Sequence, residues 1–241
     1  MPAEATGTAG TVERPSLDKG NGLAPLREQN AASEQKILSE VSHELGNFFH
    51  KLYYWAEYLG DREPAKEGDA TAGEMLQGTI KRLQDFLKTV FDYFVPVELN
   101  IVRMTADDLL NSLVGKLATR LCSTPLDVNR PEVLGSVGIL VDPARISHAL
   151  EITVSQIGHQ VGDASRIEVA IGTAIGEGRE GIEIRVAIKH PAGDSTPFRS
   201  TEASIEWALA EKLFNLHGGN ISQHVGGGEE RGVGIFLPAA G

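Results

Sequence analysis

The sequence predicts an antiparallel helical hairpin followed by an α/β sandwich. Two runs of apolar residues with helical spacing, at 37–59 and 76–94, are separated by a segment rich in glycine, proline and charge, which predicts two helices joined by a loop. After residue 97, helical patterns alternate with short runs of branched apolar residues, which is typical of helices packed on one face of a sheet. With 241 residues, 41% of them hydrophobic, the chain can fill one modest core besides the hairpin.

The first helix of the hairpin has one continuous apolar stripe. Residues three and four apart lie on one face of a helix, so His43 lies opposite the stripe, with Asn47 one turn beyond it and His50 two turns beyond it. An imidazole that faces water is available to react, although an exposed histidine with no function has the same pattern. The stripe consists of Ile37, Val41, Leu45, Phe48, Leu52, Trp55 and Leu59.

The second helix has a similar stripe, and a single hairpin cannot cover both. Pairing with a second copy to form a dimeric four-helix bundle is the simplest solution. The alternative is that the stripes pack on the rest of the same chain. The second stripe consists of Leu76, Ile80, Leu83, Leu87, Val90 and Phe94.

We predict three parts: a disordered tail at 1–30, rich in small residues and charge, the hairpin at 31–95, and the sandwich at 97–241. In the sandwich, Thr105 is the expected N-cap of the first helix, and Cys122, near the end of that helix, is expected to be buried. The glycines at 226–228 precede a strand, so we interpret them as a hairpin turn and not as a phosphate loop. The expected elements are helices at 105–121, 143–159 and 201–216, and strands at 137–141, 167–175 and 182–188 and near Ile221 and Ile235.

Composition excludes several functions. A net charge of −11 without a basic cluster argues against nucleic-acid binding. No apolar run reaches the length of a membrane span, no signal peptide is visible, and the single cysteine fits a reducing cytoplasm, where we expect the protein to act. No His-Glu-x-x-His or Cys-x-x-Cys spacing indicates a metal site, and no Gly-x-Ser-x-Gly motif indicates a serine hydrolase.

Three segments resemble bacterial two-component histidine kinases. Ser42-His43-Glu44-Leu45 with Asn47 resembles the phosphoacceptor box on the first helix of the family's dimerisation and histidine-phosphotransfer hairpin. The segment 141–150, with its Asp-Pro-Ala-Arg, resembles the entry to the nucleotide-binding helix. The segment 213–221, with Leu-His-Gly-Gly, followed by 234–238, resembles the close of the ATPase domain. The order and spacing of the segments extend the resemblance from about residue 34 to the C-terminus.

The positions that bind ATP in this family depart from its pattern. Ile152 and Gln156 stand where the family has two asparagines, of which the second helps to hold a metal ion. The segment around His190 and Gly193 does not restore the Asp-x-Gly-x-Gly turn that binds adenine. Ser204 and Glu206 replace the glycines that cradle phosphates, and Glu206 would repel a triphosphate. The resemblance therefore implies a degenerate nucleotide site.

The chain is similar in kind to dimeric histidine phosphotransferases, which exchange phosphoryl groups with the aspartates of response-regulator receivers. The resemblance implies that His43 is the phosphoacceptor and Glu44 orients its ring or takes up its proton. Asn47 would bind the phosphoryl oxygens or the partner's attacking water. Mg²⁺ would come with the receiver, and this chain would bind no cofactor.

The residues just after His43 are the expected receiver-docking surface. They are Phe49, His50, Tyr53 and Tyr54, although Phe49 also fits packing within the bundle, and His50 fits a bystander or an alternative acceptor. Two other functions remain open. One is an active kinase that binds ATP at a divergent site, and the other is a non-catalytic dimeric adaptor.

Overall fold

The computed structural model describes residues 23–60, 69–131, 137–161, 165–176, 178–189, 204–225 and 230–241. Its chain forms two compact units, Met1–Lys36 and Ile37–Gly241, and the first is described only from Leu23 onward. None of the described helices is long and apolar enough to cross a bilayer. The helices are α1 (Leu23–Gly60), α2 (Asp69–Phe94), α3 (Ala106–Arg120), α4 (Pro143–Gly158) and α5 (Ile205–Leu216). The strands are β1 (Val102–Thr105), β2 (Leu126–Asn129), β3 (Gly138–Val141), β4 (Arg166–Gly176), β5 (Arg179–Lys189), β6 (Asn220–Val225) and β7 (Glu230–Pro238).

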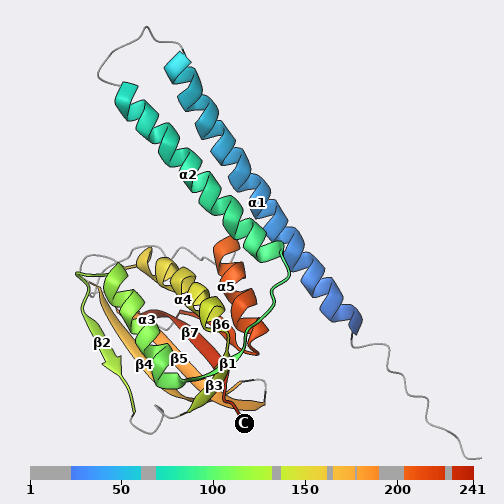
Figure 1. Ribbon diagram of the computed structural model, residues 1–241, viewed down its shortest axis with the longest axis vertical. Helices are drawn as coiled ribbons and strands as arrows, with labels where there is room; N and C mark the ends of the chain where they lie inside the picture. The colour runs from blue at the N-terminus through green and yellow to red at the C-terminus, as the bar shows by residue number, and fades with distance from the viewer. Residues whose placement is uncertain are drawn as a thin grey trace, which may run out of the picture. The chain divides into compact units, whose positions relative to one another are not determined.

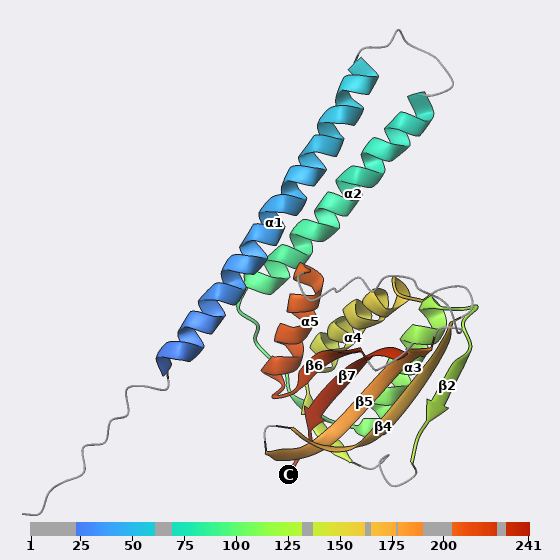
Figure 2. The same ribbon diagram turned by 180° about the vertical axis from the view of Figure 1, so that it is seen from behind.

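Helices α1 and α2 lie side by side and antiparallel, as Figure 1 and Figure 2 show, and the predicted hairpin is confirmed. The rings of Phe48 and Phe86 join the two helices, with centroids 5.6 Å apart. Along α1 the predicted stripe is buried or half-buried throughout, and Ile37 and Val41 are the most enclosed. The connecting residues 61–68 lie outside the described residues.

Only part of the predicted apolar stripe of α2 is covered within this chain. The buried residues are Ala72, Thr79 and Phe86, whereas Ile80 and Phe94, which belong to the predicted stripe, are 42% and 44% exposed. Apolar spacing identifies an apolar face but not the neighbour that covers it. Here Phe86 also packs against α5, which the spacing could not indicate.

The boundary of the predicted tail also needs correction, because α1 begins at Leu23 and not near residue 31. The proline at position 25 falls in the first turn of the helix, where an N–H group has no helical acceptor in any case. Composition suggested disorder as far as residue 30, but no residue between this proline and the apolar stripe stops a helix. The expectation for residues 1–22 lies outside the described residues.

The sandwich has a five-stranded sheet in the order β2-β4-β5-β7-β6, in which β2 is parallel to β4 and the other pairs are antiparallel. Helices α3, α4 and α5 cover one face of this sheet (Figure 2). The alternation of side chains along β5 explains why the helices cover this face. Its apolar residues all point to the helix side and are buried, and the residues between them are polar or small. The buried residues are Ile182, Ile184, Val186 and Ile188. The predicted sandwich and its longer elements are confirmed.

Two short strands were not predicted. Strand β1 pairs with β3 in a separate two-stranded sheet, and β2 forms an edge of the main sheet. Each has only four residues, which is too short for an alternation of apolar and polar residues to be recognised. The expectation for Cys122 was wrong as well, because this residue follows the end of α3 and its side chain is exposed.

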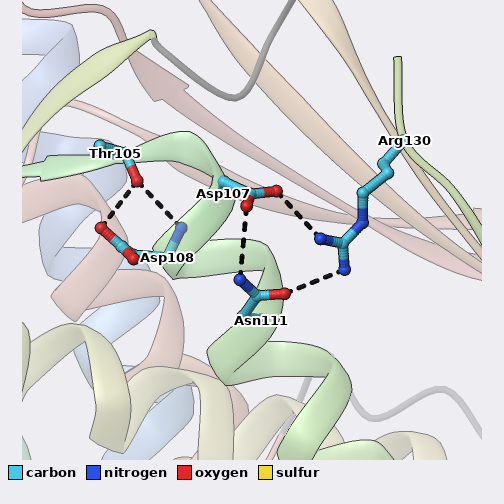
Figure 3. Close-up of polar contacts among 5 residues, drawn as sticks. All are labelled: Thr105, Asp107, Asp108, Asn111 and Arg130. Atoms are coloured by element: carbon cyan, nitrogen blue, oxygen red, sulfur yellow. Dashed lines mark hydrogen bonds and ion pairs between the residues drawn. The ribbon is translucent and has the colours of Figure 1, made fainter. Parts of the chain in front are cut away.

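A polar cluster fixes the start of α3 (Figure 3). The Thr105 hydroxyl accepts a hydrogen bond from the Asp108 N–H at 3.1 Å, which confirms the predicted N-cap. The Arg130 guanidinium donates to Asp107 Oδ1 in the same turn at 3.2 Å and to Asn111 Oδ1 one turn further on at 2.9 Å. Arg130 comes just after β2, so this contact ties the edge strand to the helix.

Candidate functional site

His43 lies on the water-facing side of α1, as the sequence predicts. Its side chain is 71% exposed, whereas Val41 and Leu45 on the opposite face are buried and half-buried. The helix holds the imidazole on a regular backbone, so its position is set by α1 and not by a loop. A bulky reactant can therefore approach the ring from solvent.

Two polar side chains from the same helix lie next to His43. Glu44 Oε1 is 3.6 Å from His43 Nδ1, and Asn47 Nδ2 is 3.3 Å from the same ring nitrogen. Asn47 Nδ2 also donates to Glu44 Oε1 at 3.3 Å. The three predicted catalytic residues are thus brought together, with Nδ1 as the ring nitrogen that faces its helix neighbours.

A hollow of about 650 Å³ lies beside Glu44, and His43 is not among the residues that line it. Carboxylates outnumber cations in its lining, which comes from the hairpin, the end of α4 and the start of α5. Within the described residues, no three His, Cys, Asp or Glu side chains are grouped as a metal ion would require. The lining consists of Glu40, Glu44, Phe48, Arg82, Asp85, Phe86, Thr89, His159, Ser204, Ile205 and Glu206.

The expected docking residues lie further along α1. Tyr53 and Tyr54 are 74% and 57% exposed, and Phe49 is 51% exposed. His50 is exposed as well. Phe49 is therefore not fully packed within this chain, and the two tyrosines present aromatic surface to solvent in the turns after His43.

The N-terminus of α5 stands where the resemblance places the phosphate-cradling glycines. Ser204 is its N-cap and accepts a hydrogen bond from the Trp207 N–H at 3.1 Å. Ile205 is 1% exposed and packs in one apolar cluster with Ile37, Val41 and Phe86 of the hairpin. Glu206 follows in the first turn. This helix end therefore packs against the hairpin, and one of its first-turn N–H groups already has a protein acceptor.

Lys212, two turns further along α5, binds the end of α2. Its ammonium donates to the carbonyl oxygens of Tyr93 and Val95, which belong to the last turn of α2 and the residue after it. The last carbonyls of a helix have no partner within the helix, so a cation there satisfies them and also favours the helix dipole. Burial lowers the pKa of Lys212 below its usual value. Sequence patterns gave no signal for this contact, which joins residues more than 100 positions apart.

The other predicted nucleotide-site positions are only partly described. On α4, Ile152 is half-buried and packs against the main core, and Gln156 is buried. His190 and Gly193 lie outside the described residues, as do the glycines at 226–228. Of the six predicted nucleotide-site positions, the structure therefore describes four: Ile152, Gln156, Ser204 and Glu206.

Two segments that carry the resemblance meet in space. The backbone N–H of Asp142 donates to His217 Nε2 at 3.0 Å, and His217 Nδ1 lies 2.6 Å from the Leu213 carbonyl oxygen, to which it donates. The Asp142 carboxylate accepts from the N–H groups of Ala144 and Arg145 at the start of α4 and from that of Asn100. These hydrogen bonds lower the pKa of Asp142.

The Leu-His-Gly-Gly segment ends α5. The N–H of Gly218 donates to Asn215 and that of Gly219 to Phe214, the two hydrogen bonds of a Schellman cap, with Gly218 at φ +71°. A Cβ on Gly219 would lie 2.2 Å from the Phe236 carbonyl oxygen, so this position has no room for a side chain. This motif is therefore structural: it ends one helix and fastens it to the start of α4.

No family model matches the sequence, and no curated protein matches it significantly. Solved structures do match. The histidine kinase AdeS of Acinetobacter baumannii is 14% identical, with a TM-score of 0.53 over 81% of this chain and 97% of that one. The histidine kinase ThkA, solved in complex with the response regulator TrrA, is 13% identical, with a TM-score of 0.65 over 89% of this chain and 64% of that one.

Full-length ShkA, solved in complex with AMPPNP, is 15% identical, with a TM-score of 0.52 over 86% of this chain and 46% of that one. The chain therefore spans nearly all of the matched AdeS chain but less than two thirds of the other two. At these identities the likeness is one of fold. In fold, this chain is similar to histidine kinases: a helical hairpin followed by an ATPase-like α/β sandwich.

Proposed function

We propose that this protein is a two-component phosphorelay protein that accepts a phosphoryl group on His43 and passes it on, exchanging it with the aspartates of response-regulator receivers. The observation that carries the proposal is the exposed imidazole of His43, with Glu44 and Asn47 in contact range, on the hairpin of a histidine kinase-like fold. The complex of ThkA with a response regulator supports receivers as the class of partner.

For phosphoryl transfer from a receiver, this chain mainly has to hold the His43 imidazole in position. In its neutral form an imidazole has a free lone pair on one ring nitrogen and can act as a nucleophile. The ring nitrogen forms a bond to phosphorus as the bond between phosphorus and the partner's aspartate oxygen breaks, and the electron pair leaves on that carboxylate. The receiver supplies the Mg²⁺ that neutralises charge in such transfers. Glu44 is the base closest to the ring and takes up its proton.

The residues at the family's ATP positions do not fit a nucleotide. Ile152 has no atom that could hold a metal ion, and Ser204 occupies a first-turn N–H that a phosphate would need. The carboxylate of Glu206 would stand against the phosphates, where repulsion in a partly dry site costs on the order of kilocalories. These features favour a phosphorylated receiver over ATP as the phosphoryl donor.

We further propose that the hairpin pairs with a second copy. Along α1 and α2, several large apolar side chains stay exposed in the single chain, and exposed apolar surface is typical of an interaction face. A four-helix bundle would cover the part of the α2 stripe that α1 leaves open. The exposed residues include Leu38, Met75, Ile80, Phe91 and Phe94.

A paired radiolabel assay tests the phosphoacceptor. Purified protein is incubated with labelled ATP alone and, separately, with a panel of labelled phospho-receivers, as wild type and as His43→Ala. The variant His50→Ala distinguishes the two histidines of α1. The matched control is His224→Ala, because His224 is an exposed histidine on β6, away from the hairpin.

We expect acid-labile, base-stable label that comes from phospho-receivers, is lost in His43→Ala and is retained in His224→Ala. Label from ATP alone would show a working kinase site and overturn the choice of donor. Loss of label in His50→Ala but not in His43→Ala would move the acceptor to His50. No label from any donor would leave a docking adaptor as the function.

A further inference from the structure

The amide of Asn47 contacts both other members of the group around His43. Its Nδ2 atom is 3.3 Å from Glu44 Oε1 and 3.3 Å from His43 Nδ1. Glu44 Oε1 is 3.6 Å from the same ring nitrogen, which is too long for a good hydrogen bond. Nδ1 therefore has one contact at hydrogen-bond distance among these neighbours, and it is with an amide nitrogen.

These contacts determine the direction of each hydrogen bond. An ionised carboxylate only accepts, so the side of Asn47 that faces Glu44 must be its NH₂ group. An amide NH₂ group only donates, so Nδ1 of His43 must offer its lone pair to it. In a neutral imidazole the hydrogen must then be on Nε2.

This tautomer is the wrong one for attack at the open side of the ring. Nδ1 faces Asn47 and Glu44, so Nε2 is the nitrogen left for an incoming phosphorus. With a hydrogen on Nε2, that atom has no free lone pair. Attack through Nε2 requires the hydrogen to be on Nδ1, and Nδ1–H needs an acceptor.

We propose that Asn47 is a positioning residue that holds His43 in its unreactive tautomer, and that Glu44 stabilises the reactive one once the Asn47 contact is released. This inference rests on the proposed role of His43 as phosphoacceptor. Glu44 needs to move by less than about 1 Å to accept from Nδ1–H at a normal charged hydrogen-bond distance of about 2.8 Å. A receiver that docks over this turn of α1 breaks the contact between Asn47 and His43 when one of its groups accepts a hydrogen bond from the Asn47 amide.

The transfer step then balances. The Nε2 lone pair forms the bond to phosphorus, and the bond to the receiver's aspartate oxygen breaks with its electron pair on that oxygen. The proton on Nδ1 passes to the Glu44 carboxylate and from there to water. Asn47 makes no bond in this step and acts only through the ring it holds.

Nitrogen NMR of protein labelled with ¹⁵N-histidine tests the proposal, because the two tautomers give distinct Nδ1 and Nε2 shifts. Spectra are recorded at alkaline pH so that the neutral ring is observed, and His43→Ala assigns the signal. Free histidine also favours Nε2–H, so the decisive comparison is between variants: wild type, Asn47→Leu, and Asn47→Leu with Glu44→Gln. Leucine is close to asparagine in size but cannot donate.

We expect the Nδ1–H share of His43 to rise several-fold in Asn47→Leu and to return toward the wild-type value in the double variant. If the Nδ1–H fraction of His43 is the same in wild type and Asn47→Leu, Asn47 does not control the tautomer. If the wild type is already mainly Nδ1–H, the proposed Nε2–H form of the free protein is wrong. Circular dichroism of each variant confirms that α1 is intact.

The spectra do not depend on phosphorylation, so the two proposals can fail separately. If His43 takes no label from any phospho-receiver, the proposed function fails whatever the tautomer. If His43 is labelled, we expect several-fold faster labelling in Asn47→Leu and slower labelling in Glu44→Gln. Slower labelling in Asn47→Leu would mean that Asn47 assists the transfer, which contradicts the inference.

Discussion

Replacing Asp142 by alanine removes the carboxylate that caps the start of α4 and also accepts from the Asn100 N–H, but keeps the backbone N–H that donates to His217. One carboxylate oxygen accepts from the N–H groups of Ala144 and Arg145 at the start of α4, at 2.9 and 3.0 Å, and the other accepts from Asn100 N–H at 2.8 Å. Losing an N-cap costs about 1 kcal/mol. Losing a hydrogen bond to a charged group costs about 1.5 kcal/mol or more.

We therefore expect Asp142→Ala to lower the free energy of unfolding by about 2.5 kcal/mol, or the melting temperature by about 5–10 °C for a chain of this size. Urea unfolding followed by circular dichroism measures the change. The control is Asp127→Ala, because Asp127 is 59% exposed and pairs only at the surface with Arg166. That pair contributes about 0–1 kcal/mol. Equal losses in the two variants would refute the capping argument.

The effect of Asp142 also depends on pH in a definite direction. Its pKa in the folded protein is lowered from its ordinary value of 3.8, first by the Asn100 N–H and then by the other hydrogen bonds. A lowered pKa gives stability that is fully present well above 3.8 and is lost as the pH falls through the folded pKa. The difference between wild type and Asp142→Ala should therefore shrink in acid below pH 3.8 and stay constant near neutrality.

Three further predictions follow from contacts described above. Gly219→Ala should cost at least about 2 kcal/mol, because its Cβ would meet the Phe236 carbonyl oxygen, whereas Gly172→Ala, with open space around it, should cost far less by the same urea assay. Ile205→Ala should cost about 2–4 kcal/mol and speed amide exchange around Phe86, since it opens a cavity between α5 and the hairpin; unchanged exchange there would contradict that packing. Tyr53→Ser with Tyr54→Ser should weaken receiver binding measured by calorimetry without lowering the melting temperature, and a large loss of stability would instead indicate packing within a bundle.

The spacing of apolar residues predicted the parts of the structure that depend on local pattern. The α1 stripe, the exposure of His43 and the N-cap at Thr105 were all predicted, because helical periodicity and capping act over a few neighbouring residues. Strand β5 was predicted for the same local reason, because its apolar residues alternate with polar or small ones and form one buried face. The positions of Glu44 and Asn47 near His43 also follow from one helix, since residues three and four apart are neighbours.

The tertiary structure decided which surfaces meet. Nothing in the local pattern indicated that Lys212 binds the end of α2, or that Asp142 bonds to His217, 75 residues away. The local pattern also did not indicate what covers Phe86 of α2, which packs against the start of α5 as well as against Phe48 of α1. Periodicity records how polar each face of an element is, whereas the partner of that face depends on how distant segments pack together.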